Sequence, residues 1–363
     1  MKTSYELVAL PGDGIGPEVV REALKVLEAT AEITGLRYET REFPYGSEHY
    51  LATGELMPEK TLDELRQHEA VFLGAIGDPR APIGLVERSV ILGMRFGLDL
   101  YVNLRPVKVY AERFCPLKDK KPEDVDLIVV RENTEDAYTQ IGGFLRKGTP
   151  QEVAITSMVH TRFGAERACR YAFELCRRKG RGKVTLVDKA NAIPSHEVWT
   201  RSFADVGKEF PEIETDHAYV DAACMWMVKN PEWFDVIVTP NLFGDIITDL
   251  GAMIQGGLGI ASSGNIHPGR VSMFEPIHGS APKYKGKNVA NPIAAILALE
   301  MLLEHLGEME AAGLIERAVC YLLTSSRIRS LSAGAHKTDE IGDFVVDEVR
   351  RVADAAGSRA PSA

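Results

Sequence analysis

The chain has 363 residues and a formal charge of −10, from 42 basic and 52 acidic residues. This length suits two domains, and the composition, 45% hydrophobic and 26% charged, is typical of a folded globular protein. The acidic balance argues against a nucleic-acid partner, because a phosphate backbone requires a basic face. No apolar run approaches the roughly 20 residues that cross a bilayer, so no membrane partner is expected. Five scattered cysteines favour a reducing, cytoplasmic compartment.

Short apolar runs alternate with helical periodicity along the chain. A strand that begins near Tyr5 enters a glycine turn, and residues 16–35 follow as an amphipathic helix with Pro17 in its first turn and Gly35 beyond its end. The other predicted elements are strands at 70–77, 124–133, 183–191 and 234–245, and helices at 61–67, 161–180 and 292–307. This alternation predicts an α/β fold with mixed, largely parallel sheets.

Three aspartates are candidate metal ligands. Asp245 and Asp249 are four residues apart in NLFGDIITDLG, which places them on one helical face. Taken alone, this pair is better explained as a solvated acidic face or as N-terminal charge that favours the helix dipole. Asp221 stands in the apolar run HAYVDAACMWMV, where a lone carboxylate would be costly. Three such oxygen donors suit Mg²⁺ or Mn²⁺, with water and substrate as further ligands.

Basic residues and a tyrosine supply complementary chemistry. Arg95, Arg105 and Arg131 lie in apolar or structured surroundings, and planar guanidinium groups match the carboxylates of a di-acid. Each alone is as consistent with a structural salt bridge. A lysine beside a cation and partly desolvated can act as a base, and a tyrosine near it can deliver a proton. Lys189 and Tyr138 each follow a predicted strand, at the sheet edge where ligands bind.

Two segments have the glycines and turn formers of nucleotide-binding loops. GDGIG at residues 12–16 lacks the G-x-G-x-x-G spacing and an acid about 20 residues further on, so a Rossmann fold is rejected. Residues 275–292, EPIHGSAPKYKGKNVANP, combine turn formers, a serine and backbone amides, and they lead into a helix. Such a loop suits a pyrophosphate.

In this order and spacing, the motifs resemble the β-decarboxylating dehydrogenase family, which includes 3-isopropylmalate, isocitrate, homoisocitrate, tartrate and D-malate dehydrogenases. The matching runs are LPGDGIGPEV, LDLYVNLRPV, VVRENTEDAY, VDKANAI, VDAACMWMV, NLFGDIITDLG, MFEPIHGSAP and NVANPIAAI, and they span residues 8 to about 345. The resemblance implies a two-domain, non-Rossmann isopropylmalate/isocitrate dehydrogenase-like fold. Residues 1–101 plus 258–363 would form the terminal, cofactor-binding domain, and residues 102–257 the central domain with the dimer interface and metal ligands.

The resemblance also implies a role for each candidate residue. The malate part of the substrate would be held by Arg95, Arg105 and Arg131, and Mg²⁺ or Mn²⁺ by Asp221, Asp245 and Asp249. Lys189 would take the proton of the 2-hydroxyl, and Tyr138 would protonate the enol left by decarboxylation. The adenosine side of NAD or NADP would contact His278, Gly279, Ser280, Ala281 and Asn291. In this family the equivalents of Lys189 and Asp221 reach the partner's active site, so a homodimer with a shared site is expected.

Substrate choice in the family depends on the run before Arg95, LVERSVILGMR. Isopropylmalate enzymes have a glutamate seven residues before that arginine and apolar residues four and three before it. In this chain the glutamate is replaced by Arg88, and the apolar positions are Ile91 and Leu92. Arg88 lies one helical turn from this apolar pair. The apolar pair suits an isopropyl group and Arg88 an acidic substituent, while Ser89 stands where isocitrate enzymes have a substrate-contacting serine. The overall resemblance favours 3-isopropylmalate dehydrogenase. The alternative activities are those of isocitrate, homoisocitrate and tartrate/D-malate-type enzymes, or of a relative acting on an acidic malate analogue. An alternative of another class is a catalytically silent regulatory subunit, which the complete set of catalytic residues disfavours.

The residues after HGSAP bear on cofactor choice. NAD-dependent relatives have an aspartate there that binds both ribose hydroxyls and would repel a 2′-phosphate. This chain has Lys283 followed by Tyr284, a pair similar to the one that NADP-dependent isocitrate dehydrogenases use. The alternative is a solvent-facing lysine in a basic loop that also contains Lys285 and Lys287. We expect NADP to be accepted, with a modest preference over NAD.

Overall fold

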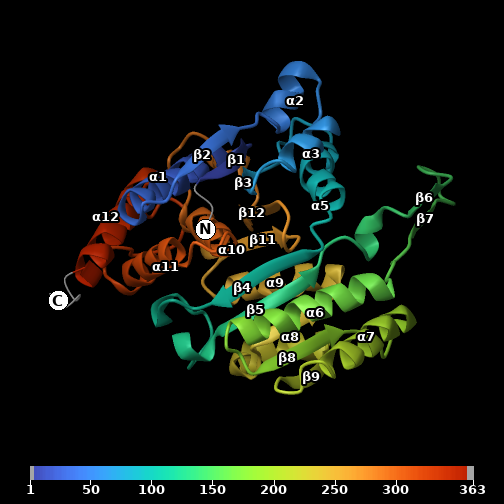
Figure 1. Ribbon diagram of the computed structural model, residues 1–363. Coiled ribbons are helices and arrows are strands. Elements are labelled where there is room, and N and C mark those ends of the chain that lie inside the picture. Colours follow the sequence, from blue (N-terminus) through green and yellow to red (C-terminus); the bar gives the residue numbers. More distant parts are fainter. Residues whose placement is uncertain (1–3, 358–363) are drawn as a thin grey trace. The chain divides into compact units, whose positions relative to one another are not determined.

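The computed structural model describes residues 4–357, which form two compact units. Unit 1 extends to Leu98, includes Val109–Pro122 and resumes from Ala252 onwards, while unit 2 comprises Asp99–Lys108 and Glu123–Gly251. Both units alternate strands and helices (Figure 1). Their sheets are mixed and largely parallel, which confirms the predicted fold class.

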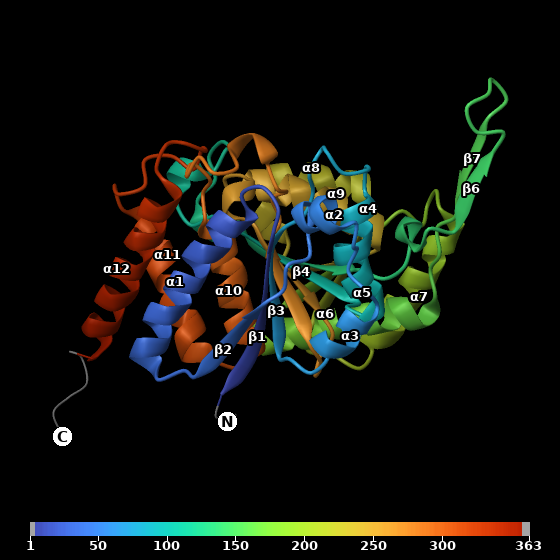
Figure 2. The same ribbon diagram turned by 90° about the horizontal axis from the view of Figure 1, so that it is seen from above.

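The strands of unit 1 are ordered β2-β1-β3-β12-β11. They are β1 (Tyr5–Gly12), β2 (Tyr38–Glu42), β3 (Ala70–Ala75), β11 (Ser262–Ile266) and β12 (Ser272–Pro276). All neighbours in this order are parallel except β11, which runs antiparallel to β12. Four long helices gather on one side of β1 and β3 (Figure 2): α1 (Gly16–Thr34), α10 (Ile293–His305), α11 (Met309–Thr324) and α12 (Thr338–Gly357). Shorter helices are α2 (Ser47–Thr53), α3 (Lys60–Leu65), α4 (Leu85–Glu87) and α5 (Gly93–Gly97).

Helices α1 and α10 show how the sequence determines the packing of unit 1. Helix α1 has proline at its start and ends at Gly35, whose φ of 72° only glycine adopts readily, as predicted. Helix α10 has no polar face, and all its residues from Ile293 to Leu303 except Glu300 are buried. It packs against β12 and β11 and also against α1 and α11. Because each buried Leu or Ile contributes about 1.5–3 kcal/mol, α10 forms the centre of this core.

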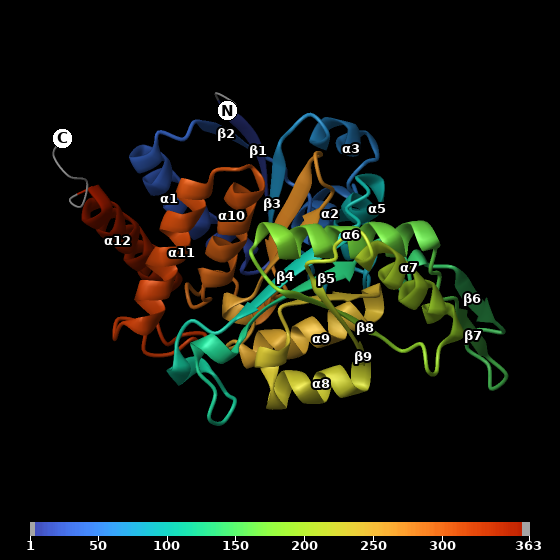
Figure 3. The ribbon, with the colours of Figure 1, turned by 60° about the horizontal axis from the view of Figure 1, so that its bottom comes forward.

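The strands of unit 2 are ordered β4-β5-β10-β8-β9. They are β4 (Val102–Lys108), β5 (Asp126–Glu132), β8 (Lys183–Asp188), β9 (Glu214–Tyr219) and β10 (Val236–Thr239). β4 is antiparallel to β5, and the remaining neighbours are parallel. The helices are α6 (Arg162–Arg178), α7 (Glu197–Gly207), α8 (Val220–Lys229) and α9 (Asn241–Ile254). A separate hairpin, β6 (Gly142–Leu145) and β7 (Val153–Thr156), projects away from these elements (Figure 3).

The parallel pairing brings three chemically important positions to one edge of this sheet. Arg131, near the end of β5, is paired in register with Thr239 at the end of β10. Lys189 directly follows β8, and α9 begins two residues after β10. The carboxyl ends of these strands therefore present an arginine, a lysine and the start of an acidic helix together.

Residues 109–122 differ from the sequence-based boundary, which placed them in the central domain. They belong to unit 1. Arg113 contacts the rest of that unit, because its Nη2 donates to the carbonyl oxygens of Leu323 and Ile328 at 2.7 and 2.8 Å. Within residues 4–357, no helix is long and apolar enough to cross a membrane. The five cysteines are free thiols.

Candidate active site

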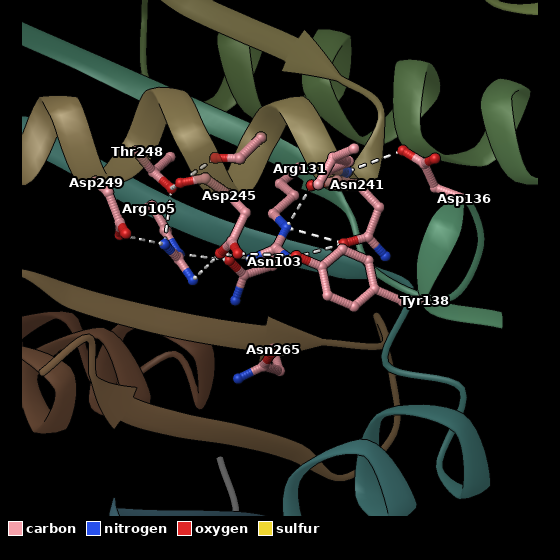
Figure 4. A network of polar contacts seen from close by, with 12 residues as sticks. Asn103, Arg105, Arg131, Asp136, Tyr138, Asn241, Asp245, Thr248, Asp249 and Asn265 are labelled. Atoms are coloured by element: carbon pink, nitrogen blue, oxygen red, sulfur yellow. Dashed lines mark hydrogen bonds and ion pairs between the residues drawn. The ribbon is translucent and has the colours of Figure 1, made fainter. Parts of the chain in front are cut away.

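The centre of the candidate site in unit 2 is the carboxylate of Asp245 on α9 (Figure 4). Its Oδ1 lies 2.6 Å from Nη1 of Arg131 and 3.4 Å from Nη2 of Arg105. Its Oδ2 accepts a hydrogen bond of 2.9 Å from the hydroxyl of Tyr138. The structure thus brings four predicted site residues, from β4, β5, α9 and the turn at Ala137–Thr139, into one network.

Arg131 is fixed on every side. The side chain is 1% exposed, and its Nε and Nη2 donate to Oδ1 of Asn241 at 3.0 and 2.8 Å. Nε also donates to the backbone carbonyl of Asn241 at 2.9 Å. Its aliphatic part crosses α9 at Gly244, where a Cβ atom would lie 2.4 Å from Cγ of Arg131. A glycine at this position is therefore what lets α9 approach the arginine.

Arg105 is held in a similar way on the neighbouring strand. Its Nε donates to Oδ1 of Asn103, and its Nη1 to Oγ1 of Thr248, both at 2.7 Å. Nη1 also lies 3.6 Å from Oδ1 of Asp249, one turn beyond Asp245 on α9. The two aspartates therefore share one helical face as predicted, and this face meets two guanidinium groups rather than solvent alone.

Asp136 is a site residue that sequence reasoning missed. Its carboxylate accepts hydrogen bonds from the backbone N–H of Ala137 at 2.8 Å and of Leu242 at 2.9 Å. It thereby joins the turn that carries Tyr138 to the first turn of α9. Its φ of 69° is unusual for a residue with a side chain, and such backbone strain concentrates at functional sites. The residue lies within the matching run VVRENTEDAY, which was the available signal.

Lys189 and Asp221 form a second group in unit 2. The lysine Nζ lies 2.7 Å from Oδ1 of Asp221, in the first turn of α8, and holds the pKa of that carboxyl below its usual range. The expectation that Asp221 sits in costly apolar surroundings is wrong, because its side chain is 67% exposed. Within residues 4–357, no three acidic, histidine or cysteine side chains gather into a metal-binding group. One chain therefore does not unite Asp221 with Asp245 and Asp249.

The specificity segment of unit 1 is a π-helix, Arg88–Leu92, not the α-helix that the expected spacing assumed. Its wider turn, with i→i+5 bonds, is frequent at functional sites. Arg88 is exposed, and its guanidinium folds back over Gly84, where a Cβ atom would lie 2.9 Å from Nη1. Ser89, Ile91 and Leu92 are half-buried. Arg88 is therefore open to solvent, whereas the apolar pair is partly covered.

Arg95, the third candidate arginine, lies in α5 of unit 1. Its Nη2 is 3.4 Å from Oε1 of Glu275, which also accepts a hydrogen bond of 2.7 Å from Asn265. Its Nε is buried and has no hydrogen-bond partner within residues 4–357. The N–H group at Nε can therefore donate to a ligand.

The two glycine-containing segments of unit 1 meet, which the sequence did not reveal. The backbone N–H of Ile15 donates to the carbonyl of Ser280 at 2.8 Å. At Gly14, with φ of 59°, a Cβ atom would lie 1.9 Å from that same oxygen. The buried carboxylate of Asp13 accepts hydrogen bonds from the backbone N–H groups of Ser47 and Gly77 at 2.9 and 2.8 Å. The GDGIG turn therefore contacts the backbone of the predicted cofactor loop at Ser280 and supports it there.

The predicted adenosine residues include polar atoms that are buried without partners. His278 Nε2 and Asn291 Nδ2 make no hydrogen bond within the described part of the chain. Burial lowers the pKa of His278, which favours its neutral imidazole. Between them, Gly279 is exposed, Ser280 is buried, and Ala281 has a left-handed backbone with φ of 41°. Atoms of this kind suit a ligand with its own donors and acceptors.

The basic residues near this loop differ in their surroundings. Lys283 is exposed, its Nζ lies 4.7 Å from the ring centroid of Tyr284, and it forms no ion pair within residues 4–357. Lys285 is paired with Glu48 at 2.7 Å. Arg327 is paired with acidic residues of α12, Asp347 and Glu348, at 3.0 and 3.2 Å.

Comparison with known proteins gives consistent matches along the chain. The profile of the family described as isocitrate/isopropylmalate dehydrogenase matches residues 6–345. The 3-isopropylmalate dehydrogenase of Thermobifida fusca is 49% identical over 349 residues, which cover 95% of this chain and 98% of that protein. The enzyme of the same name from Streptomyces avermitilis is 47% identical, with coverages of 96% and 99%. The crystal structure of isocitrate dehydrogenase from Methylococcus capsulatus superposes with a TM-score of 0.85 at 38% identity, covering 95% and 99% of the two chains.

Proposed function

The chain belongs to the isocitrate/isopropylmalate dehydrogenase family, and we propose that it is the 3-isopropylmalate dehydrogenase of leucine biosynthesis. In this reaction a substituted malate is oxidised at its 2-hydroxyl and then loses carbon dioxide. The observation that carries the proposal is the network in which Arg105, Arg131 and Tyr138 meet Asp245. Two fixed guanidinium groups suit a carboxylate of the substrate, and the tyrosine hydroxyl lies beside them to move a proton.

The aspartates suit a divalent cation. Asp245 and Asp249 offer hard carboxylate oxygens from one helical face, with side chains 39% and 65% exposed. Such donors select Mg²⁺ or Mn²⁺ over softer metals. We assign both aspartates, with Asp221, as the ligands. When bound, the metal would polarise the 2-hydroxyl and stabilise negative charge, while the nicotinamide would accept the hydride.

The chain's own residues would perform the proton transfers. Lys189 would take the proton from the hydroxyl oxygen as C2 is oxidised. After carbon dioxide leaves, the enol would take a proton at C3 from Tyr138. The hydrogen bond from Tyr138 to Asp245 and the guanidinium of Arg131, 5.4 Å from the ring centroid, hold the tyrosine in place. Arg95 would be a further carboxylate contact.

We propose a homodimer in which each active site uses residues of both subunits. Within residues 4–357 Asp221 does not join Asp245 and Asp249 in a metal-binding group, and Lys189 is paired with Asp221, so a second copy would supply both. Exposed apolar side chains on α8 and α9 suit such an interface: Met225 is 62% exposed, Ile246 53% and Met253 59%. The hairpin β6–β7 adds Phe144, Leu145 and Ile155 to the exposed apolar surface. Apolar patches of this kind mark contacts between proteins.

We propose that NADP is accepted in preference to NAD, through Lys283 and Tyr284. The exposed lysine is held over the tyrosine ring, in the position where NAD-dependent relatives have an acid. Its charge would attract a 2′-phosphate, with His278, Gly279, Ser280, Ala281 and Asn291 around the adenosine. The cytoplasmic location expected from the cysteines stays a prediction.

A panel of 2-hydroxy di- and tri-acids, each with both cofactors and Mg²⁺ or Mn²⁺, tests the proposal. We expect the highest kcat/KM with 3-isopropylmalate, because Ile91 and Leu92 suit its apolar substituent. Since Arg88 faces outward, Arg88→Ala should change kcat/KM for 3-isopropylmalate by less than about threefold. A preference for isocitrate or homoisocitrate, together with a loss of several kcal/mol in Arg88→Ala, would instead assign an acidic-substrate enzyme.

A further inference from the structure

Two buried histidines lie directly behind Lys189 in unit 2. Nδ1 of His196 accepts a hydrogen bond of 3.2 Å from the backbone N–H of Lys189. The ring of His160 meets that of His196 edge-on, with centroids 4.7 Å apart and planes at 78°. Both side chains are almost fully buried. Neither histidine has a role in the proposed chemistry, yet one of them touches the segment of the proposed base.

The neighbours of the two rings determine which nitrogen carries the proton. Because Nδ1 of His196 accepts from Lys189, its proton must be on Nε2. Nδ1 of His160 accepts from the indole N–H of Trp199 at 3.3 Å, so its proton is also on Nε2, which lies 3.8 Å from Oδ1 of Asp136. Burial, with a smaller contribution from His160, lowers the pKa of His196 to about 4. Burial lowers the pKa of His160 as well.

The same rings contact the other parts of the candidate site in unit 2. His196 packs against Phe243 with centroids 5.4 Å apart, and Phe243 stands two residues before Asp245 on α9. Asp136, which faces His160, anchors the Tyr138 turn to α9. The histidine pair therefore connects the Lys189 segment to the elements that present Tyr138 and Asp245.

We propose that His196 is a positioning residue for Lys189, and that His160, packed edge-on against the His196 ring, keeps that ring in place. The proposal rests on the proposed role of Lys189 as the base. The carbonyl of Lys189 accepts from Ala192 and Ile193 at 3.0 and 2.8 Å, so the turn is closed on that side. The bond to His196 fixes the other side. Because misplacement by about 1 Å can cost about 100-fold in rate, this anchor would control how well the lysine reaches its proton.

Two amide substitutions separate the hydrogen-bond acceptor at the position of Nδ1 from the filling of space, because the larger of the two, glutamine, is the one that misplaces the acceptor. In His196→Asn the side-chain oxygen branches at the same carbon as Nδ1, so it can still accept from Lys189. In His196→Gln the oxygen is one carbon further out, near the position of Nε2. We expect His196→Asn to keep kcat within about threefold of wild type, and His196→Gln to lose about tenfold or more with KM little changed. His196→Leu, which removes the acceptor, should behave like His196→Gln.

The step affected provides a second readout. The 2-keto-3-carboxy intermediate, supplied directly, needs decarboxylation and protonation but no oxidation. His196→Gln should therefore process this intermediate at nearly the wild-type rate while oxidation of 3-isopropylmalate falls. Equal loss in both assays, or equal kcat in the Asn and Gln variants, would overturn the positioning role.

Two further variants separate this inference from neighbouring explanations. Trp199→Phe removes the donor to His160 but leaves the bond from Lys189 to His196, so it should lower Tm and retain kcat. Lys189→Met tests the proposed base itself. If Lys189→Met is inactive and folded His196→Gln has normal kcat, the positioning proposal fails and the proposed function stands. If Lys189→Met retains activity, the assignment of the base is wrong instead.

Discussion

Nη1 of Arg131 lies 2.6 Å from Oδ1 of Asp245, so a proposed substrate-binding group and a proposed metal ligand neutralise each other within one chain. Arg131 is buried, and an unpaired buried charge would be costly. Binding of a cation at Asp245 would release the arginine for an anion, and binding of an anion at Arg131 would release the aspartate for a cation. Metal and substrate are therefore linked through this pair.

We predict that 3-isopropylmalate and Mn²⁺ strengthen each other's binding. The expected increase in Mn²⁺ affinity on saturation with substrate is about tenfold, or 1.4 kcal/mol of coupling. Titration calorimetry with and without substrate measures it, and the reciprocal titration must give the same factor. Malate lacking the isopropyl group should show similar coupling, because the exchange involves only its carboxylates. Independent binding of metal and substrate would contradict this prediction.

Asp245→Asn should lower both activity and stability. It removes an anionic metal ligand, so turnover with Mg²⁺ should fall about 100-fold or more. It also removes the charged partner that lies 2.6 Å from the buried guanidinium of Arg131, which should cost about 1–2 kcal/mol even without metal, since Asp245 is partly exposed. Activity assays and thermal unfolding in EDTA measure the two effects. Asp249→Asn is the control, because Asp249 lies further from both arginines, and it should lose activity with a smaller loss of Tm.

Gly244→Ala should disturb the arginine without adding or removing a charge. The new methyl group would lie 2.4 Å from Cγ of Arg131, so the side chain or α9 must move. Overpacking of this kind costs about 1–3 kcal/mol. We expect a raised KM for 3-isopropylmalate and a reduced Tm. Gly182→Ala is the matched control in the same unit, since its new methyl group would have its nearest contact at an ordinary distance of 3.7 Å. Wild-type kinetics in both variants would argue against a fixed Arg131.

Lys283→Asp should reverse the preference between NADP and NAD. The change removes an attractive charge and adds a repulsive one beside the proposed 2′-phosphate. Lys287→Asp makes the same change of charge in the same exposed loop and should leave the ratio nearly unchanged. The measurement is kcat/KM for both cofactors in three proteins. If wild type uses NAD at least about tenfold better and Lys283→Asp does not move the ratio, the lysine is not a phosphate contact.

The buried imidazole of His196 should make the folded protein sensitive to acid. Its pKa is lowered from 6.5 to about 4 by burial and by His160, against the opposing charges of Asp188 and Asp136. Between these two pH values the unfolded chain binds more protons, so this histidine's contribution to stability is full above pH 6.5 and lost as pH falls. The free energy of unfolding, measured in urea at intervals from pH 7 to 4.5, should fall less steeply with pH in His196→Asn than in wild type. Identical slopes would show that His196 does not contribute to the pH dependence of stability.

Local chemistry explains which parts of the fold were predictable. Helix α1 follows from its apolar periodicity with Pro17 and Gly35 at its ends, and the pairing of Asp245 with Asp249 follows from their spacing. Residues 109–122 belong to unit 1, where Arg113 contacts carbonyls more than 200 residues away, and no local pattern records such contacts.

The missed features of the site have a similar cause. Asp221 appeared buried because its neighbours in the sequence are apolar, but it occupies the first turn of α8 and faces outward. The π-helical turn at Arg88–Leu92 has no signal in residue spacing, because the sequence pattern is read with the period of an α-helix. Asp136 accepts from a backbone N–H 106 residues further along the chain, and His196 accepts from the N–H of Lys189 across a loop, so only the folded chain shows what they hold.

The contact of His196 with both Lys189 and Phe243 has a consequence for a dimer assembled as proposed. Each subunit would lend Lys189 to its partner's catalytic centre while keeping Tyr138 and Asp245 for its own. The imidazole would then be a structural link between halves of two different centres. Consider a mixed dimer in which one subunit carries His196→Gln. Oxidation would be impaired at the centre of the normal subunit, which uses the lysine of the altered one. The altered subunit's own centre would still oxidise substrate, because its lysine comes from the normal subunit.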